Sequence, residues 1–293
     1  MPNIYVIITI YKFGGISMGA IINNFDFTYC TNLSGVERVK ICDEFNFFMS
    51  DYPWYNNNDS RMAVVTKRVI EAIQRNPNLM YVRHKYIDYG EERLETLGDW
   101  CYDRYLFDAV AFILKDKKGA TIPDHRGMTL GMKCANRGLG WLAINCKDNE
   151  IAMTQLSNEK KDITLYGAER RLFDVVREGI KFDGVMTRQR MGDGKTAGMI
   201  CAGSIPTDMS TALIHASLMR EYFANDKARA LKDCNGFTML DIFQQAYNQA
   251  SEGNGVKATS QQSNQDTKII MKMYADLLEE INESYYTSKE IAD

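Results

Sequence analysis

Five stretches of the chain carry apolar residues at every third or fourth position, which is the spacing of one helix face. The first stretch is capped by Asp59 or Ser60 and ends at Asn76-Pro77, because proline cannot continue a helix. The other predicted helices span residues 168–180, 208–223, 237–250 and 267–286. The pattern therefore predicts helices along much of the chain.

Short apolar runs between these helices predict β-strands. Residues 79–87 read as one strand. Two hairpins are expected, one at residues 109–122 with a turn at 115–119 and one at 141–156 with a turn at 147–149. Because the strands come in hairpins and do not alternate with helices, we expect an α+β fold of mixed antiparallel hairpins with surrounding helices. No internal repeat is evident.

Composition divides the chain into segments. Residues 18–250 have the size and composition of a single α+β domain, and residues 251–266 are rich in Gly, Ser, Gln and Asn, as in a flexible linker. The helix predicted at 267–286 is too short to be stable alone, so its apolar stripe must be buried on its own core or on a neighbouring subunit. The stripe consists of Ile269, Ile270, Met273, Tyr274, Leu277, Leu278 and Ile281.

The first seventeen residues admit two interpretations. Gly14-Gly15 can be encoded by a bacterial ribosome-binding sequence, and Met18 follows at a short distance. Residues 1–17 are then an untranslated leader read in frame, which would indicate a bacterium or a bacteriophage. The alternative is an ordinary N-terminal β-strand, since residues 4–11 are rich in Ile and Tyr.

Charge and residue counts narrow the function classes. The 293 residues include 35 basic and 38 acidic ones, so a surface that is basic throughout and binds nucleic acid everywhere is not expected. Three histidines limit the chain to one His-rich metal site, and we predict neither a metal nor a cofactor. Seven scattered cysteines without a Cys-x-x-Cys pair indicate a reducing compartment. No apolar run approaches the roughly 18–20 residues of a membrane span, and no signal peptide is evident. We expect the cytoplasm of a bacterial host, or a virion, and no secretion.

One glycine-rich string resembles the phosphate-binding loop of P-loop ATPases. It contains Gly192, Gly194, Lys195 and Thr196. In that family the backbone N–H groups and the lysine bind phosphates, and the threonine hydroxyl binds Mg²⁺. The chain departs from the family at Gln189, where the full motif requires glycine. The alternative interpretation is a glycine-rich surface turn with a solvated lysine.

Two further patterns point to nucleic-acid chemistry. Pro123-Asp124, followed by Glu159 and Lys161, resembles the Pro-Asp…Glu-x-Lys pattern of nucleases, which implies a Mg²⁺-dependent carboxylate site. A single-strand groove is the second prediction, with tyrosines stacking on bases and the alternative of a solvated strand face. Its residues are Tyr81, Arg83, Lys85, Tyr86, Arg188 and Arg190.

Two hypotheses of function result from these patterns. The first is an interaction or assembly protein, a bacteriophage structural component that self-associates through its tethered C-terminal helix or binds another phage protein. The 16 methionines and 16 tyrosines suit contact surfaces. The second is a phage or bacterial enzyme acting on nucleotides or nucleic acid, built around residues 192–196 or the carboxylate site. No coherent catalytic set is evident, so the first is favoured.

Overall fold

The computed structural model describes residues 25–30, 33–51, 59–88, 90–252 and 261–290. The proposed leader at 1–17 and residues 253–260 of the predicted linker lie outside the described residues. The chain folds as two compact units, unit 1 (residues 1–133) and unit 2 (residues 134–293), and the boundary falls within one short helix.

Unit 1 contains the sheet of the protein's described part. Its strands β1 (Phe25–Asp26), β2 (Arg83–Asp88) and β3 (Glu91–Thr96) are antiparallel and lie in the order β1-β2-β3. Phe25 is buried and contacts His84 across the β1–β2 pair, with ring centroids 5.1 Å apart. The helices of this unit are α2 (Gly35–Asp51), α3 (Asp59–Arg75), α4 (Leu97–Asp103) and α5 (Phe107–Lys115), with two 3₁₀ turns, η1 (Pro77–Met80) and η2 (Gly119–Thr121).

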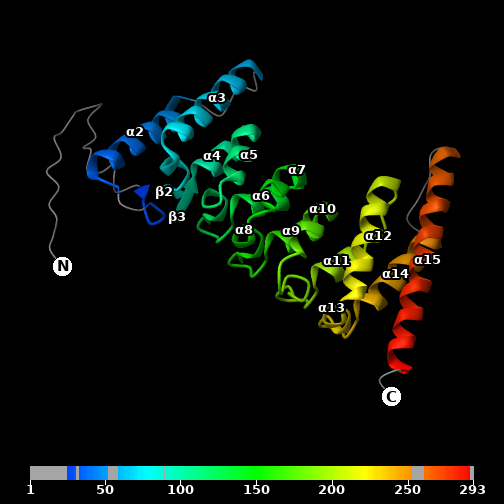
Figure 1. The fold of residues 1–293 in the computed structure, drawn as a ribbon. Coiled ribbons are helices and arrows are strands. Elements are labelled where there is room, and N and C mark those ends of the chain that lie inside the picture. The colour runs from blue at the N-terminus through cyan, green and yellow to red at the C-terminus, as the bar shows by residue number, and fades with distance from the viewer. Residues whose placement is uncertain (1–24, 31–32, 52–58, 89, 253–260, 291–293) are drawn as a thin grey trace, which may run out of the picture. The chain divides into compact units, whose positions relative to one another are not determined.

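Unit 2 consists of two rows of helices (Figure 1). Helices α9, α11 and α14 pack against one another as the first row, while α10, α12 and α15 form the second. The bounds are α7 (Gly140–Ala143), α8 (Glu150–Thr154), α9 (Ile163–Glu169), α10 (Phe173–Gly179), α11 (Ala197–Ala202), α12 (Met209–Ala224), α13 (Asp226–Ala230), α14 (Met239–Ser251) and α15 (Gln261–Glu290), with the 3₁₀ turn η3 (Ile144–Cys146) after α7. Helix α6 (Leu130–Asn136) spans the boundary between the units.

The structure confirms the α+β class and most of the long helices, but it places the sheet differently. The hairpins predicted at 109–122 and 141–156 are wrong, because these residues form α5, η2, α7, η3 and α8. The apolar run 109–114 is the buried face of a helix, with Ala109, Val110, Ile113 and Leu114 all at most 2% exposed. Apolar runs this short have no period that separates a strand from a buried helix. The predicted helix 168–180 is interrupted at Arg170 to Leu172 and becomes the end of α9 and all of α10.

A period of 33 residues runs through the middle of the chain, so the expectation of no internal repeat is wrong. Helices α4, α6 and α9 are each seven residues long and begin at Leu97, Leu130 and Ile163. Each is preceded by a side chain that accepts the N–H three residues further on. These bonds join Thr96 Oγ1 to Asp99 N at 3.0 Å, Thr129 Oγ1 to Met132 N at 3.4 Å and Asp162 Oδ1 to Leu165 N at 2.8 Å.

The turn after each of these helices repeats with the same period. Tyr105, Gly138 and Arg171 have φ of 60°, 81° and 59°, and each is followed by a leucine that precedes the second helix. The N–H of that leucine donates to a carbonyl oxygen five residues earlier, at 2.8 to 2.9 Å in all three turns. The segment from 96 to 179 is therefore three copies of one helix–turn–helix unit.

Two further helix pairs follow in unit 2 with longer helices. Thr196 caps α11, 34 residues after Asp162, and Thr238 caps α14 a further 42 residues on. The second helices α12 and α15 are 16 and 30 residues long, against seven for α10. The added length accounts for the departure from the 33-residue period.

The C-terminal apolar stripe is covered within unit 2. Ile270, Tyr274, Leu277, Leu278 and Ile281 are at most 5% exposed and belong to the same core as α11, α12 and α14. Met273 packs against that core, whereas Ile269 is 50% exposed. Of the two alternatives for this helix, burial on its own core is the one the structure shows.

Candidate interaction surface

Three turns precede the first-row helices of unit 2 and form one surface. They are residues 156–162 before α9, 188–196 before α11 and 232–238 before α14, and together we call them the turn edge. Each turn ends at the side chain that caps the next helix, Asp162, Thr196 or Thr238. Because caps fix where each helix begins, they also fix the position of each turn.

Left-handed backbone positions shape the turns. Lys160, Gly194 and Gly236 have φ of 59°, 70° and 84°, each two residues before the cap. At Gly194 a β-carbon would also lie 3.2 Å from Cys234 N in the next turn, so glycine is needed here for close approach as well as for φ. In the last turn the carboxylate of Asp233 accepts the N–H groups of Asn235 at 2.9 Å and Phe237 at 3.0 Å.

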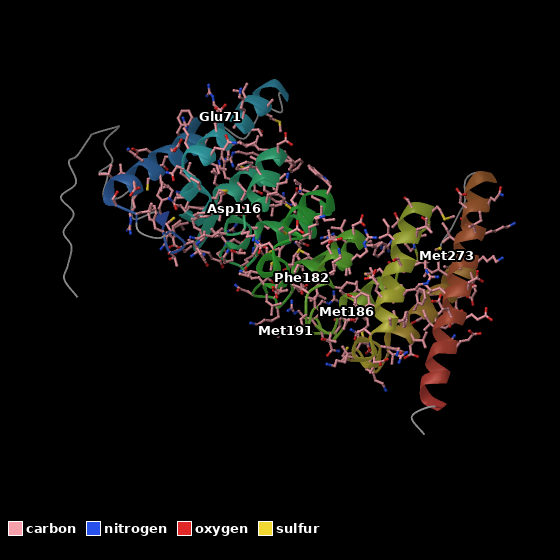
Figure 2. All side chains as sticks on the ribbon, in the orientation of Figure 1. Glu71, Asp116, Phe182, Met186, Met191 and Met273 are labelled. Atoms are coloured by element: carbon pink, nitrogen blue, oxygen red, sulfur yellow. The ribbon has the colours of Figure 1, made fainter. Side chains whose placement is uncertain are left out.

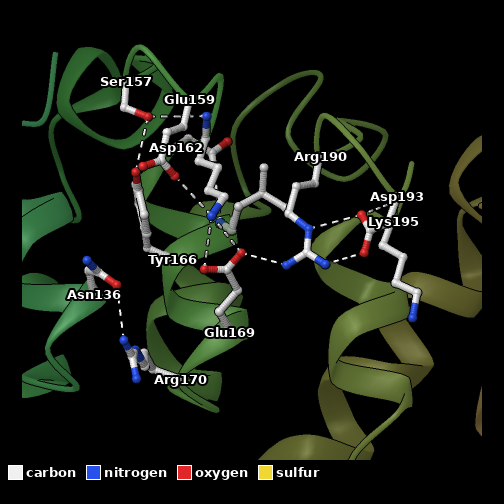
Figure 3. A network of polar contacts seen from close by, with 12 residues as sticks. Asn136, Ser157, Glu159, Asp162, Tyr166, Glu169, Arg170, Arg190, Asp193 and Lys195 are labelled. Carbon is white, nitrogen blue, oxygen red and sulfur yellow. Dashed lines mark hydrogen bonds and ion pairs between the residues drawn. The ribbon is translucent and has the colours of Figure 1, made fainter. Parts of the chain in front are cut away.

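Arginines join the first turn to the second (Figure 3). Arg188 pairs with the Asp162 carboxylate and donates to Thr154 O at 3.0 Å. Arg190 donates to Glu169 at 2.6 Å and also pairs with Asp193. Burial raises the pKa of Asp162, while Arg188 acts in the opposite direction. Hydrogen bonds from Arg190 hold the pKa of Asp193 below its usual value.

Lys161 completes this network (Figure 3). Its ammonium nitrogen lies 3.1 Å from Glu159 and 3.0 Å from Glu169. Partial burial lowers the pKa of Lys161, but the two carboxylates outweigh it and the pKa is raised. The Tyr166 ring lies beneath the same ammonium group, and its hydroxyl is 3.2 Å from Ser157 Oγ. The first turn is thus fixed by polar contacts on both sides.

Hydrogen bonds to backbone oxygens join the second turn to the third. Cys234 N donates to Asp193 O at 2.9 Å, and Gln189 Nε2 donates to Lys232 O at 2.8 Å. Gln189 Nε2 also lies 2.7 Å from Gly194 O. The three turns are therefore linked into a continuous and internally braced edge.

The turn edge exposes large apolar side chains. Met191 is 68% exposed, Phe237 49% and Leu156 41%. Met191, labelled in Figure 2, extends from the loop between α10 and α11. Exposed apolar side chains that cluster on a braced surface are typical of protein contact sites.

The structure gives the glycine-rich string a local role. Thr196 is 1% exposed and its Oγ1 accepts the N–H of Met199 at 3.2 Å, as a helix cap. The Lys195 side chain extends away from the polar network (Figure 3). The order glycine, any residue, threonine recurs before other helices of the repeat, at 127–129 and 236–238, without a lysine. Nucleotide binding by Gly192, Gly194, Lys195 and Thr196 stays a prediction.

The residues of the predicted nucleic-acid groove are divided between the two units. In unit 1, Arg83 pairs with Asp26, Tyr81 donates to Asp116 at 3.2 Å and Lys85 lies 3.9 Å from Glu92. Tyr86 stacks on the His84 ring, with centroids 5.9 Å apart. In unit 2, Arg188 and Arg190 are engaged by carboxylates. The groove stays a prediction, and its arginines are already paired.

The carboxylates of the nuclease-like pattern are also engaged within their own units. Asp124 in unit 1 lies 3.0 Å from the Lys133 ammonium and accepts the N–H groups of Arg126 and Met128 at 2.8 and 2.9 Å. Glu159 in unit 2 pairs with Lys161. Within the described ranges, no group of three or more His, Cys, Asp and Glu side chains is placed to hold a metal ion. No helix there is long and apolar enough to cross a membrane.

Most of the turn edge lies outside the residues that the sequence predicts to be functional. No motif points to Leu156, Lys160, Met191, Lys232 or Phe237, although one signal is present. Asp124-x-x-Gly127-x-Thr129 and Asp233-x-x-Gly236-x-Thr238 are the same turn-and-cap pattern at two places in the chain. Aligning them places exposed residues of the later turn one position before the cap.

No protein-family model matches this chain, and no curated protein matches it in sequence. The class of the protein is therefore defined by its own geometry. From Thr96 onward it is built of successive helix–turn–helix units with capped first helices. Such an arrangement is that of a helical repeat protein.

Proposed function

We propose that this chain is an interaction protein that binds another protein through the turn edge of unit 2. The observation that carries the proposal is the 33-residue register of caps, left-handed turns and second-helix leucines. A 33-residue unit of a β-turn and two helices, whose first helix starts at a threonine, is the ankyrin type of repeat. We infer that the segment from Thr96 onward is of this type, and such arrays present extended binding surfaces.

The bracing of the turn edge supports this role. Contacts among Arg188, Arg190, Asp162 and Glu169 hold the turns in place before any partner arrives. A surface that is ordered in advance loses less conformational entropy on binding. Exposed Met191 and Phe237 then supply contact area on this fixed frame.

Helix α15 supports a different role from the one expected of it. Its apolar stripe faces the core of unit 2, and its outward positions Lys272, Asp276, Glu279 and Glu280 are polar. Terminal repeats need a polar outer face to be soluble, so α15 fits a capping helix. We therefore place the contact surface on the turn edge and not on the stripe. The bacteriophage origin stays a prediction on which no structural feature bears.

The proposal is tested by site-specific photocrosslinking in the native host. A photoreactive phenylalanine analogue replaces Met191, Phe237 or Leu213 in turn, and Leu213 is the control because it is 56% exposed on α12, away from the turns. We expect the same crosslinked protein from positions 191 and 237, and none from 213. A second copy of this chain counts as a partner and is recognised by the mass of the product. Equal yields at all three positions, or none at 191 and 237, would refute the proposal.

A further inference from the structure

We propose that the turn edge binds an acidic protein segment in an extended conformation, with apolar side chains alternating with its carboxylates. This inference rests on the proposed function, because it names the class of partner for the same surface. Two independent properties of the edge carry it: lysines that lack a carboxylate partner, and apolar side chains that lie among them.

One lysine without an ion pair lies on each of the three turns. Lys160, Lys195 and Lys232 make no ion pair with any residue that the structure describes. Asp193 is close enough to Lys195 for the ammonium to lower its pKa, but that carboxylate is already held by Arg190. The three ammonium groups are therefore free to meet carboxylates of a partner.

The acidic residues of the edge are already engaged. Glu159 and Glu169 pair with Lys161, and Glu169 also accepts from Arg190. The Asp233 side chain turns toward backbone N–H groups of its own turn, and the residue is 7% exposed. Positive charge is thus available to a partner on the edge, although the whole chain is acidic.

The apolar side chains of the edge interleave with these lysines. Leu156 lies on the turn of Lys160, Met191 on that of Lys195 and Phe237 on that of Lys232. Methionine adapts to irregular partner surfaces, and aromatic residues are common anchors of interfaces. Each turn therefore offers one cation and one apolar contact.

The spacing of the turns fits an extended segment. First-row helices in contact are separated by roughly 8–10 Å, so the outer two turns are roughly 16–20 Å apart. An extended chain of about six residues spans that distance. A single nucleic-acid strand fits less well, because it needs an aromatic platform for successive bases and Phe237 is the one aromatic residue in residues 156–162, 188–196 and 232–238.

Fluorescence anisotropy with a labelled peptide tests the proposal. The probe has about ten alternating Glu and Leu residues, which is longer than the edge requires. The two comparison probes are a Lys-Leu peptide and an oligothymidylate of similar length. The full chain is measured beside Lys160→Glu/Lys195→Glu/Lys232→Glu and beside a control with the same charge change, Lys147→Glu/Lys268→Glu/Lys272→Glu, whose lysines are unpaired within the described residues and lie off the turns.

We expect the Glu-Leu peptide to bind and the Lys-Leu peptide not to bind. The turn variant should weaken binding by about 10-fold or more, and the control by less than about 2-fold. Met191→Ser/Phe237→Ser should also weaken it, since half of the contact is apolar. Equal loss in both charge variants, or an oligothymidylate that binds through the same three lysines, would overturn the proposal. If no peptide binds but positions 191 and 237 still crosslink to a partner, the acidic segment is wrong and the proposed function stands.

Discussion

Two kinds of helix pair stabilise unit 2 in different ways. The pair α9 and α10 has seven residues in each helix, and its ends are fixed by the Asp162 cap and the turn at Arg171. The pair α12 and α15 has 16 and 30 residues and encloses a buried polar contact, His215 with Tyr274. Short helices depend on caps and neighbours for stability, whereas the long terminal pair supplies a large apolar face of its own. The comparison identifies α15 as the end of the stack.

Removal of α15 should have the largest effect on this comparison. A chain ending at Ala250 loses the five buried side chains of α15, each worth about 1.5–3 kcal/mol on burial, so on the order of 10 kcal/mol as an upper bound. That is comparable to the whole stability of a domain. We expect unit 2 of the truncated chain to lose its cooperative thermal transition, measured by circular dichroism. An unchanged melting temperature would show that α15 does not cap the stack.

Acidification should distinguish the two pairs next. His215 is fully buried: Nε2 lies 2.9 Å from Cys201 O, to which it must donate, and Nδ1 lies 2.8 Å from Tyr274 Oη. Burial lowers the pKa of His215 to about 4, below its unfolded value of 6.5. The unfolded chain therefore binds a proton that the native chain does not, between pH 6.5 and pH 4.

The stability is present in full above pH 6.5 and falls by about 3 kcal/mol as the pH is lowered to 4. Urea unfolding at a series of pH values measures this change. His215→Gln cannot titrate, so its stability should lose this part of the pH dependence whatever its absolute value. A wild-type curve with the same pH slope as His215→Gln would contradict the assignment.

A close contact within the short pair should come third in size. A β-carbon on Gly179 would lie 1.9 Å from Thr164 Oγ1, so α9 and α10 meet here through a residue without a side chain. Gly179→Ala should cost about 1–3 kcal/mol by overpacking, read from the urea midpoint. Thr164→Ala removes the opposing oxygen and should restore part of the loss in the double variant. Additive effects in the double-mutant cycle would exclude this contact.

The long helices could be predicted from the sequence because their period is strong, and the short ones could not. The helix 208–223 has several turns of apolar spacing, and Asp208 caps it as an ordinary N-cap. By contrast α7 has four residues and α8 five, too few to show any period, so their apolar residues are indistinguishable from strands in the sequence. Residues 153 and 163 are buried because neighbouring repeats cover them, which no local pattern records.

The turn edge could be predicted only in part, for a related reason. Gly194-Lys195-Thr196 is conspicuous as a string, and its resemblance to a phosphate loop obscures its recurrence elsewhere in the chain. The repeated Thr-Leu-Gly at 96–98 and 129–131 is the clearest local trace of the period. At the third unit the cap is Asp162, so the trace is lost in residue identity while the geometry is kept. Repeats that share backbone positions more than residue types are found by spacing and not by composition.

The smallest predicted effect tests the period itself. Gly138 and Arg171 hold the same turn position 33 residues apart, with φ of 81° and 59°, and arginine is strained there whereas glycine is not. Arg171→Gly should therefore raise stability by about 0.5–1 kcal/mol, even though glycine usually destabilises. Arg170→Gly, one residue earlier at the end of α9, is the matched control and should lower stability. Both shifts are measurable as urea midpoints at constant slope. Opposite signs at adjacent arginines would follow from the repeat register alone, and equal signs would mean that the turn at 171 is not equivalent to the turn at 138.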